Sequence, residues 1–82
     1  MTEAYIYDAV RSPRGKGRPD GSLHEVTSVA LSAKILNAIK ERNGLEGHAV
    51  EDVIWGNVTQ VGEQGGCLAR SAVLASDLDE SI

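Results

Sequence analysis

The 82-residue sequence contains a single cysteine, Cys67, and only two histidines, His24 and His48. One cysteine permits no internal disulfide, which fits a reducing compartment. These three side chains are too few for a four-ligand zinc cluster. We therefore expect no structural metal.

Long apolar runs are absent as well. No stretch is long and apolar enough to cross a membrane, and residues 1–7 lack the basic start, apolar core and cleavage site of a secretory signal. The expected location is cytoplasmic, without a membrane anchor or span. The net charge of −4 at pH 7 argues against nucleic-acid binding, because proteins that bind phosphate backbones usually carry a surplus of Lys and Arg.

The residues that are present alternate between strand and helix patterns. Residues 4–10 and 50–61 are rich in branched and aromatic side chains, which is typical of strands covered on both faces. Both prolines and three glycines fall within residues 12–22, so this segment is predicted to be a loop. Thr27 is a typical helix N-cap, and apolar residues at three- and four-residue spacing predict a helix that ends near Arg42. Residues 67–76 are alanine-rich and predict a second, short helix.

The order strand, helix, strand, helix predicts an α/β fold. Strands that alternate with helices form parallel sheets, which are normally covered by helices on both faces. A chain of this length buries only roughly 60% of the surface that it exposes when unfolded, and two strands leave two unpaired edges. We therefore expect residues 1–82 to be one domain or less, incomplete as an independent domain.

Cys67 is the first candidate for chemistry. It follows two glycines and falls at the start of a predicted helix, where exposed N–H groups stabilise a thiolate. No histidine has a visible reason to lie beside it, and a small residue in an alanine-rich helix usually serves packing. Packing is the preferred interpretation, and no catalytic residue is assigned within the chain.

The other polar groups have simpler interpretations. The glycines near Lys16 do not have the spacing of a dinucleotide or P-loop motif. A solvated loop is the preferred interpretation of the nearby positive charges, and an anion site is the alternative for four basic residues: Arg11, Arg14, Lys16 and Arg18. His24 and His48 lack a visible catalytic partner, so we expect surface histidines. Two acidic groups, at residues 51–52 and 77–80, look like solvated margins of helices and strands.

Several motifs follow one another in an order that resembles the N-terminal segment of the thiolase family. They are Asp-Ala-Val-Arg-Ser-Pro-Arg-Gly-Lys at residues 8–16, the Thr27 helix, Asp-Val-Ile-Trp-Gly-Asn-Val-Thr-Gln at 52–60, Gly65-Gly66 and Ala69-Arg70. The likeness covers nearly the whole chain. The resemblance is specific because all of these motifs occur in the same order and at the same spacing. Any one of them alone would be weak evidence for the family.

The resemblance implies a subunit with two similar α/β halves in a layered αβαβα fold, assembled as a homodimer or homotetramer. Residues 1–82 would be the β-α-β-α start of its N-terminal domain, completed by the remainder of the subunit. The family transfers acyl groups of coenzyme A thioesters through a cysteine, in condensation with a second acyl-CoA or in thiolytic cleavage of a 3-ketoacyl-CoA, as in fatty acid metabolism. It requires no metal, and we expect no cofactor.

The family nucleophile lies in an Asn-x-x-Cys-x-Ser-Gly segment after the next strand, which is not among these 82 residues. We expect the chain alone to be inactive and Cys67 to be dispensable. The resemblance also implies that Gln64, Gly65, Gly66 and Arg70 support the active site and the subunit interface. The alternative is a non-catalytic, thiolase-like accessory or binding polypeptide that a partner chain completes.

Overall fold

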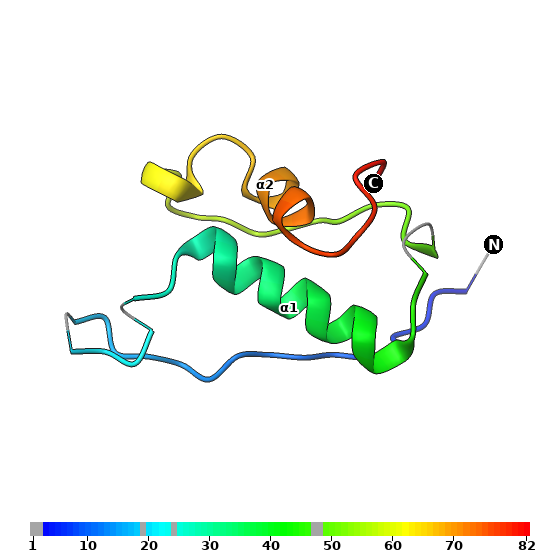
Figure 1. Ribbon diagram of the computed structural model, residues 1–82, viewed down its shortest axis with the longest axis horizontal. Coiled ribbons are helices and arrows are strands. Elements are labelled where there is room, and N and C mark those ends of the chain that lie inside the picture. Colours follow the sequence, from blue (N-terminus) through cyan, green and yellow to red (C-terminus); the bar gives the residue numbers. More distant parts are fainter. Residues whose placement is uncertain (1–2, 19, 24, 47–48) are drawn as a thin grey trace.

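The computed structural model describes residues 3–18, 20–23, 25–46 and 49–82 (Figure 1). Two α-helices are present in this part of the chain, α1 at Ser28–Asn43 and α2 at Leu68–Ala75, with a short 3-10 helix, η2, at Gly62–Gln64. The molecule measures 46 × 26 × 25 Å along its principal axes. Its long axis is close to the direction of α1 in Figure 1.

Helix α1 confirms the prediction of a helix after Thr27. The Thr27 Oγ1 accepts a hydrogen bond from the Ala30 amide at 3.1 Å, which satisfies one of the unpaired N–H groups of the first turn. At the other end Gly44 adopts a left-handed conformation with φ of 59°, which glycine tolerates without strain. Lys40 and Arg42 lie in the last turn, where positive charge suits the helix dipole.

Helix α2 confirms the second helical prediction, with Cys67 as its N-cap residue and Ser76 as its C-cap residue. Two bonds from α1 hold the end of α2. Lys40 Nζ donates to the carbonyl of Asp77 at 2.8 Å, and the Asp77 amide donates to Asn37 Oδ1 at 2.7 Å. The two helices are therefore joined by polar contacts at the point where α2 ends.

The hydrophobic core lies between the two helices. Leu36 of α1 packs with Ala72 and Val73 of α2 and with Leu78, and Ala72 is fully buried. Partly buried apolar residues from the segment at 50–61 and from the end of the described chain pack against this cluster: Val50, Val53, Trp55 and Ile82. The core is small, as the chain length predicts.

None of the residues that the structure describes forms a β-strand, so the two predicted strands are not present. Residues 4–10 and 50–61 both lie beside α1, but Figure 1 shows the helix between them. A strand needs a neighbouring strand for its backbone hydrogen bonds, and no such pairing joins the two segments in the described residues, although residues 5–8 and Val50 line one common pocket. The layered αβαβα arrangement stays a prediction.

The segment at residues 12–22 is a loop, as predicted, in all of its described residues. The Gly21 amide donates to the Arg18 carbonyl at 2.9 Å and closes a turn. A Cβ atom at Gly21 would lie 2.1 Å from the Lys16 carbonyl oxygen, so only glycine fits there. Among the described residues, no helix is both long and apolar enough to cross a membrane.

Candidate functional site

The turn that leads into α2 contains three of the four predicted support residues. Gln64 ends η2, Gly65 follows it, and both are half-buried, whereas Gly66 is exposed. The Gln64 amide donates to the Val61 carbonyl at 3.1 Å, and the Gly65 amide donates to the Gly62 carbonyl at 3.0 Å. Gly62 and Gly66 have φ of 58° and 66°, so the turn is bounded by two residues in the left-handed region that favours glycine.

Asn57, which precedes this turn in the sequence, donates a side-chain hydrogen bond to it. Its Nδ2 donates to the Gln64 carbonyl at 2.6 Å, and the Asn57 side chain is partly buried. Asn57 belongs to the motif at residues 52–60, but no role is predicted for it from the sequence. Its position directly after a glycine, at the end of an apolar segment, is the signal that would have identified it, because asparagine side chains commonly bond to nearby main-chain groups.

Arg70 does not join the other three predicted residues through its hydrogen bonds. Its Nη1 donates to the Ile82 carbonyl at 2.6 Å, and its Nη2 donates to the Glu80 carbonyl at 2.7 Å. The guanidinium therefore binds the segment that follows α2, whereas Gln64, Gly65 and Gly66 form the turn that precedes it. The structure shows a turn and a separate clamp at the two ends of α2.

A small cavity of about 180 Å³ lies beside Arg70 and Cys67. Its other lining residues come from the second long segment, α2 and the end of the described chain: Asp52, Val53, Ala69, Val73 and Ile82. Cys67 is exposed and its side chain makes no capping hydrogen bond to α2. Cys67 lies at the start of α2 and lines this cavity together with Arg70.

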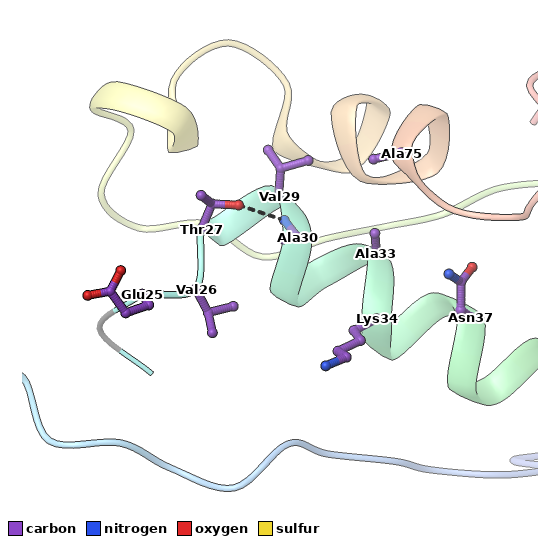
Figure 2. A pocket seen from close by; sticks show the side chains of 9 residues that line it. All are labelled: Glu25, Val26, Thr27, Val29, Ala30, Ala33, Lys34, Asn37 and Ala75. Atoms are coloured by element: carbon purple, nitrogen blue, oxygen red, sulfur yellow. Dashed lines mark hydrogen bonds between the residues drawn. The ribbon is translucent and has the colours of Figure 1, made fainter. Parts of the chain in front are cut away.

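A larger groove of about 640 Å³ runs along the N-terminal half of α1 (Figure 2). Its lining is mostly small or apolar: Glu25, Val26, Thr27, Val29, Ala30, Ala33, Lys34, Asn37 and Ala75. Figure 2 shows the Thr27 hydroxyl turned toward the Ala30 amide, where it caps α1. Among the described residues, the lining of this groove contains no cysteine, which is the nucleophile expected for this kind of acyl transfer.

The basic residues of the first loop are all exposed: Arg11, Arg14, Lys16 and Arg18. Arg11 Nη1 donates to the neighbouring Ser12 carbonyl at 3.3 Å. Arg11 and Arg42 of α1 line the same shallow depression, which has a volume of about 570 Å³. Its other lining residues are Ala9, Val10, Pro13 and Ala38. Arg42 is paired with Asp8, so its charge is already partly balanced, and an anion site at these residues stays a hypothesis.

The acidic groups make local contacts. Asp52 Oδ1 accepts a hydrogen bond from the Val53 amide at 2.8 Å, and Asp79 Oδ1 accepts one from the Ser81 amide at 2.9 Å. Within the part of the chain that the structure describes, no three His, Cys, Asp or Glu side chains come together in a way that could hold a metal ion. His24 and His48 lie outside the described residues, so their surface positions stay a prediction.

The order of motifs and the glycine turn can be compared with known proteins. Residues 4–82 match the family described as "Thiolase, N-terminal domain". Proteins named 3-ketoacyl-CoA thiolase are similar over nearly the whole chain, with 37% identity in Pseudoalteromonas atlantica, 42% in Colwellia psychrerythraea and 39% in Acinetobacter baylyi. The match covers 100% of this chain in the first two and 98% in the third.

The chain spans about 21% of the length of the first two relatives and 20% of the third. No solved structure gives a significant match. The family match covers well over half of the chain, and it includes the loop after residue 10, the capped helix α1 and the glycine turn before α2. On these grounds the chain belongs to the thiolase family.

Proposed function

We propose that this chain is the N-terminal segment of a thiolase-type acyltransferase subunit that acts on coenzyme A thioesters. The observation that carries the proposal is the match of residues 4–82 to the thiolase N-terminal domain. In condensation, a cysteine thiolate attacks the thioester carbonyl of one acyl-CoA and releases coenzyme A, and the acyl-enzyme then passes its acyl group to the α-carbon of a second acyl-CoA. In thiolysis, the thiolate attacks the 3-keto carbonyl of a 3-ketoacyl-CoA, the bond between C2 and C3 breaks, and acetyl-CoA leaves as its α-carbon takes up a proton. The thiolate of coenzyme A then accepts the acyl group from the cysteine, which leaves as a thiolate.

The nucleophile of this reaction lies outside these 82 residues in the proposal. The present residues supply part of the surrounding framework. Gly65 and Gly66 follow each other in the turn before α2, and the lack of a side chain at both positions permits another group to approach the backbone closely. The side-chain amide of Gln64 is able both to donate and to accept hydrogen bonds. Arg70 fixes the segment that follows α2. No metal or cofactor takes part.

The proposal includes assembly with the remainder of the subunit, and of that subunit into a homodimer or homotetramer in the cytoplasm. Exposed apolar residues support an assembly of this kind. Ile54 and Val58 are 92% and 99% exposed, although they lie in a segment whose sequence is typical of a buried strand. Side chains of this type are normally covered in the finished protein.

A second candidate is a non-catalytic, thiolase-like polypeptide that a separate partner chain completes. The same exposed apolar residues favour it, since a different polypeptide would cover them equally well. The two candidates differ in where the family's nucleophile segment is encoded, and therefore in the mass of the native polypeptide.

The deciding experiment is a denaturing intact-mass measurement on the protein purified from its source, followed by an assay of thiolysis with acetoacetyl-CoA and coenzyme A. A polypeptide several times longer that contains residues 1–82 and cleaves acetoacetyl-CoA would support the acyltransferase. A lone species of about 8.7 kDa without turnover would contradict it and favour the accessory polypeptide. We call the longer polypeptide the complete subunit below.

A further inference from the structure

The turn before α2 has a conformation that several main-chain features define. Gly62 and Gly66 are both in the left-handed region, and two short-range amide-to-carbonyl hydrogen bonds close η2 between them. A Cβ atom at Gly65 would lie 3.1 Å from the Gly62 carbonyl oxygen, which is a tight contact. These features shape the turn itself but do not tie it to the rest of the molecule.

Asn57 supplies such a tie. The carbonyl of Gln64 is at the end of η2, where helix carbonyls have no partner within the helix, and it accepts the hydrogen bond from Asn57 Nδ2 at 2.6 Å. Asn57 lies seven residues earlier, in the long segment at residues 50–61, and its side chain is partly buried. The bond fixes the Gln64 main chain relative to that segment, and hence the point from which the Gln64 side chain starts.

We infer that Asn57 is a positioning residue for the acyl-transfer site, acting through the placement of Gln64. This inference rests on the proposed function and on the support role proposed there for Gln64. Asn57 need not touch the substrate. Small displacements of groups around a reacting centre lower the rate strongly, whereas substrate binding spreads over many contacts and changes less.

The test compares kcat and KM for thiolysis by the complete subunit. Asn57→Ala is expected to lower kcat by about 10-fold to 100-fold while KM changes by less than about 2-fold. Asn43→Ala is the matched control. Asn43 also donates hydrogen bonds through Nδ2, to Asp8 Oδ2 and the Ile39 carbonyl, but at the far end of α1. Its replacement is expected to leave kcat within about 2-fold.

A double-mutant cycle shows whether Asn57 acts through Gln64. In a Gln64→Ala background, Asn57→Ala is expected to lower kcat by less than about 2-fold further, because the side chain that it positions is already gone. Full additivity of the two losses would overturn the inference. So would a kcat for Asn57→Ala that equals the wild-type value.

Hydrogen exchange provides a readout that does not depend on turnover. In Asn57→Ala the Gln64 and Gly65 amides are expected to exchange faster than in the wild type, while the α1 amides keep their protection. Asn57→Asp, which keeps the side-chain shape without the N–H donor, serves the same purpose if the alanine variant does not fold. Unchanged exchange at Gln64 and Gly65 would overturn the inference. A wild-type complete subunit without thiolysis activity would overturn the proposed function itself, whereas an active wild type with a neutral Asn57→Ala overturns only the role of Asn57.

Discussion

Arg42 Nε lies 3.3 Å from Asp8 Oδ2, and the same carboxylate oxygen accepts a hydrogen bond from Asn43 Nδ2 at 2.9 Å. This contact joins the first long segment to the C-terminal end of α1. The hydrogen bond from Asn43 is the main reason that the pKa of Asp8 lies below its ordinary value. The Ala9 amide and the positive charge of Arg42 lower the pKa further, while burial opposes the shift.

The lowered pKa of Asp8 predicts a loss of stability in acid. A carboxyl group with a lowered folded-state pKa contributes stability that is fully present above the ordinary Asp pKa of about 3.9 and is lost as pH falls through the folded-state pKa. In the complete subunit, Asp8→Asn is expected to flatten the dependence of the urea midpoint on pH between about 5 and 3. Asp20→Asn, in the exposed first loop, is the control. Parallel pH profiles for wild type and Asp8→Asn would contradict the prediction.

The helices could be predicted from the sequence because their signals are local. The start of α1 is defined by Thr27, which caps the Ala30 amide three residues later, and its end is defined by Gly44 after the last turn. Neither signal depends on another part of the chain. The strands could not be confirmed in the same way. Residues 4–10 and 50–61 have the composition of strands, but a strand also requires a partner, and α1 lies between these two segments (Figure 1).

The candidate site was predicted only in part for a related reason. The glycine turn is visible in the sequence because its glycines are adjacent to α2. The bond from Asn57 to the Gln64 carbonyl depends on how two segments lie in space, which composition does not specify. The support role of Arg70 stays a prediction, and its hydrogen bonds to the carbonyls of Glu80 and Ile82 could not be read from the sequence either.

Cys67 is expected to be dispensable for turnover. It is exposed and caps α2 through its main chain only, with its carbonyl accepting a hydrogen bond from the Ser71 amide at 3.1 Å. Cys67→Ala in the complete subunit is therefore expected to keep kcat/KM within about 3-fold of the wild type, and Cys67→Ser provides a second, polar variant. Loss of turnover by several orders of magnitude in both variants would show that Cys67 is the nucleophile.

Arg70 is expected to stabilise the segment after α2 against local opening. Its guanidinium binds two carbonyls at once, a geometry that the single ammonium of lysine reproduces poorly. Charge-assisted bonds at an exposed position contribute about 1 kcal/mol, so Arg70→Ala is expected to speed hydrogen exchange at Ser81 and Ile82 by roughly 5-fold to 10-fold. Arg70→Lys should be intermediate, and Arg18→Ala in the first loop should have no effect. Equal hydrogen-exchange rates at Ser81 and Ile82 in Arg70→Ala and wild type would show that Arg70 does not stabilise this segment.

The isolated 82-residue chain is expected to self-associate. Its core is a small cluster around the fully buried Ala72, whereas Ile6, Ile54 and Val58 are each more than 90% exposed on segments of high β propensity. Such segments pair with other chains when nothing covers them. Light scattering and sedimentation should detect oligomers, and thermal unfolding should lack a cooperative transition of a monomer.

A matched variant distinguishes this cause of association from simple instability. Ile54→Thr with Val58→Thr keeps β-branched side chains but removes apolar surface at positions that the structure leaves exposed. The variant is expected to associate less at the same concentration, with helical content by circular dichroism unchanged. Equal association of the two chains would trace the effect to other surfaces. A monomer of the original sequence that unfolds cooperatively would show that the two helices and their small core are sufficient to fold alone.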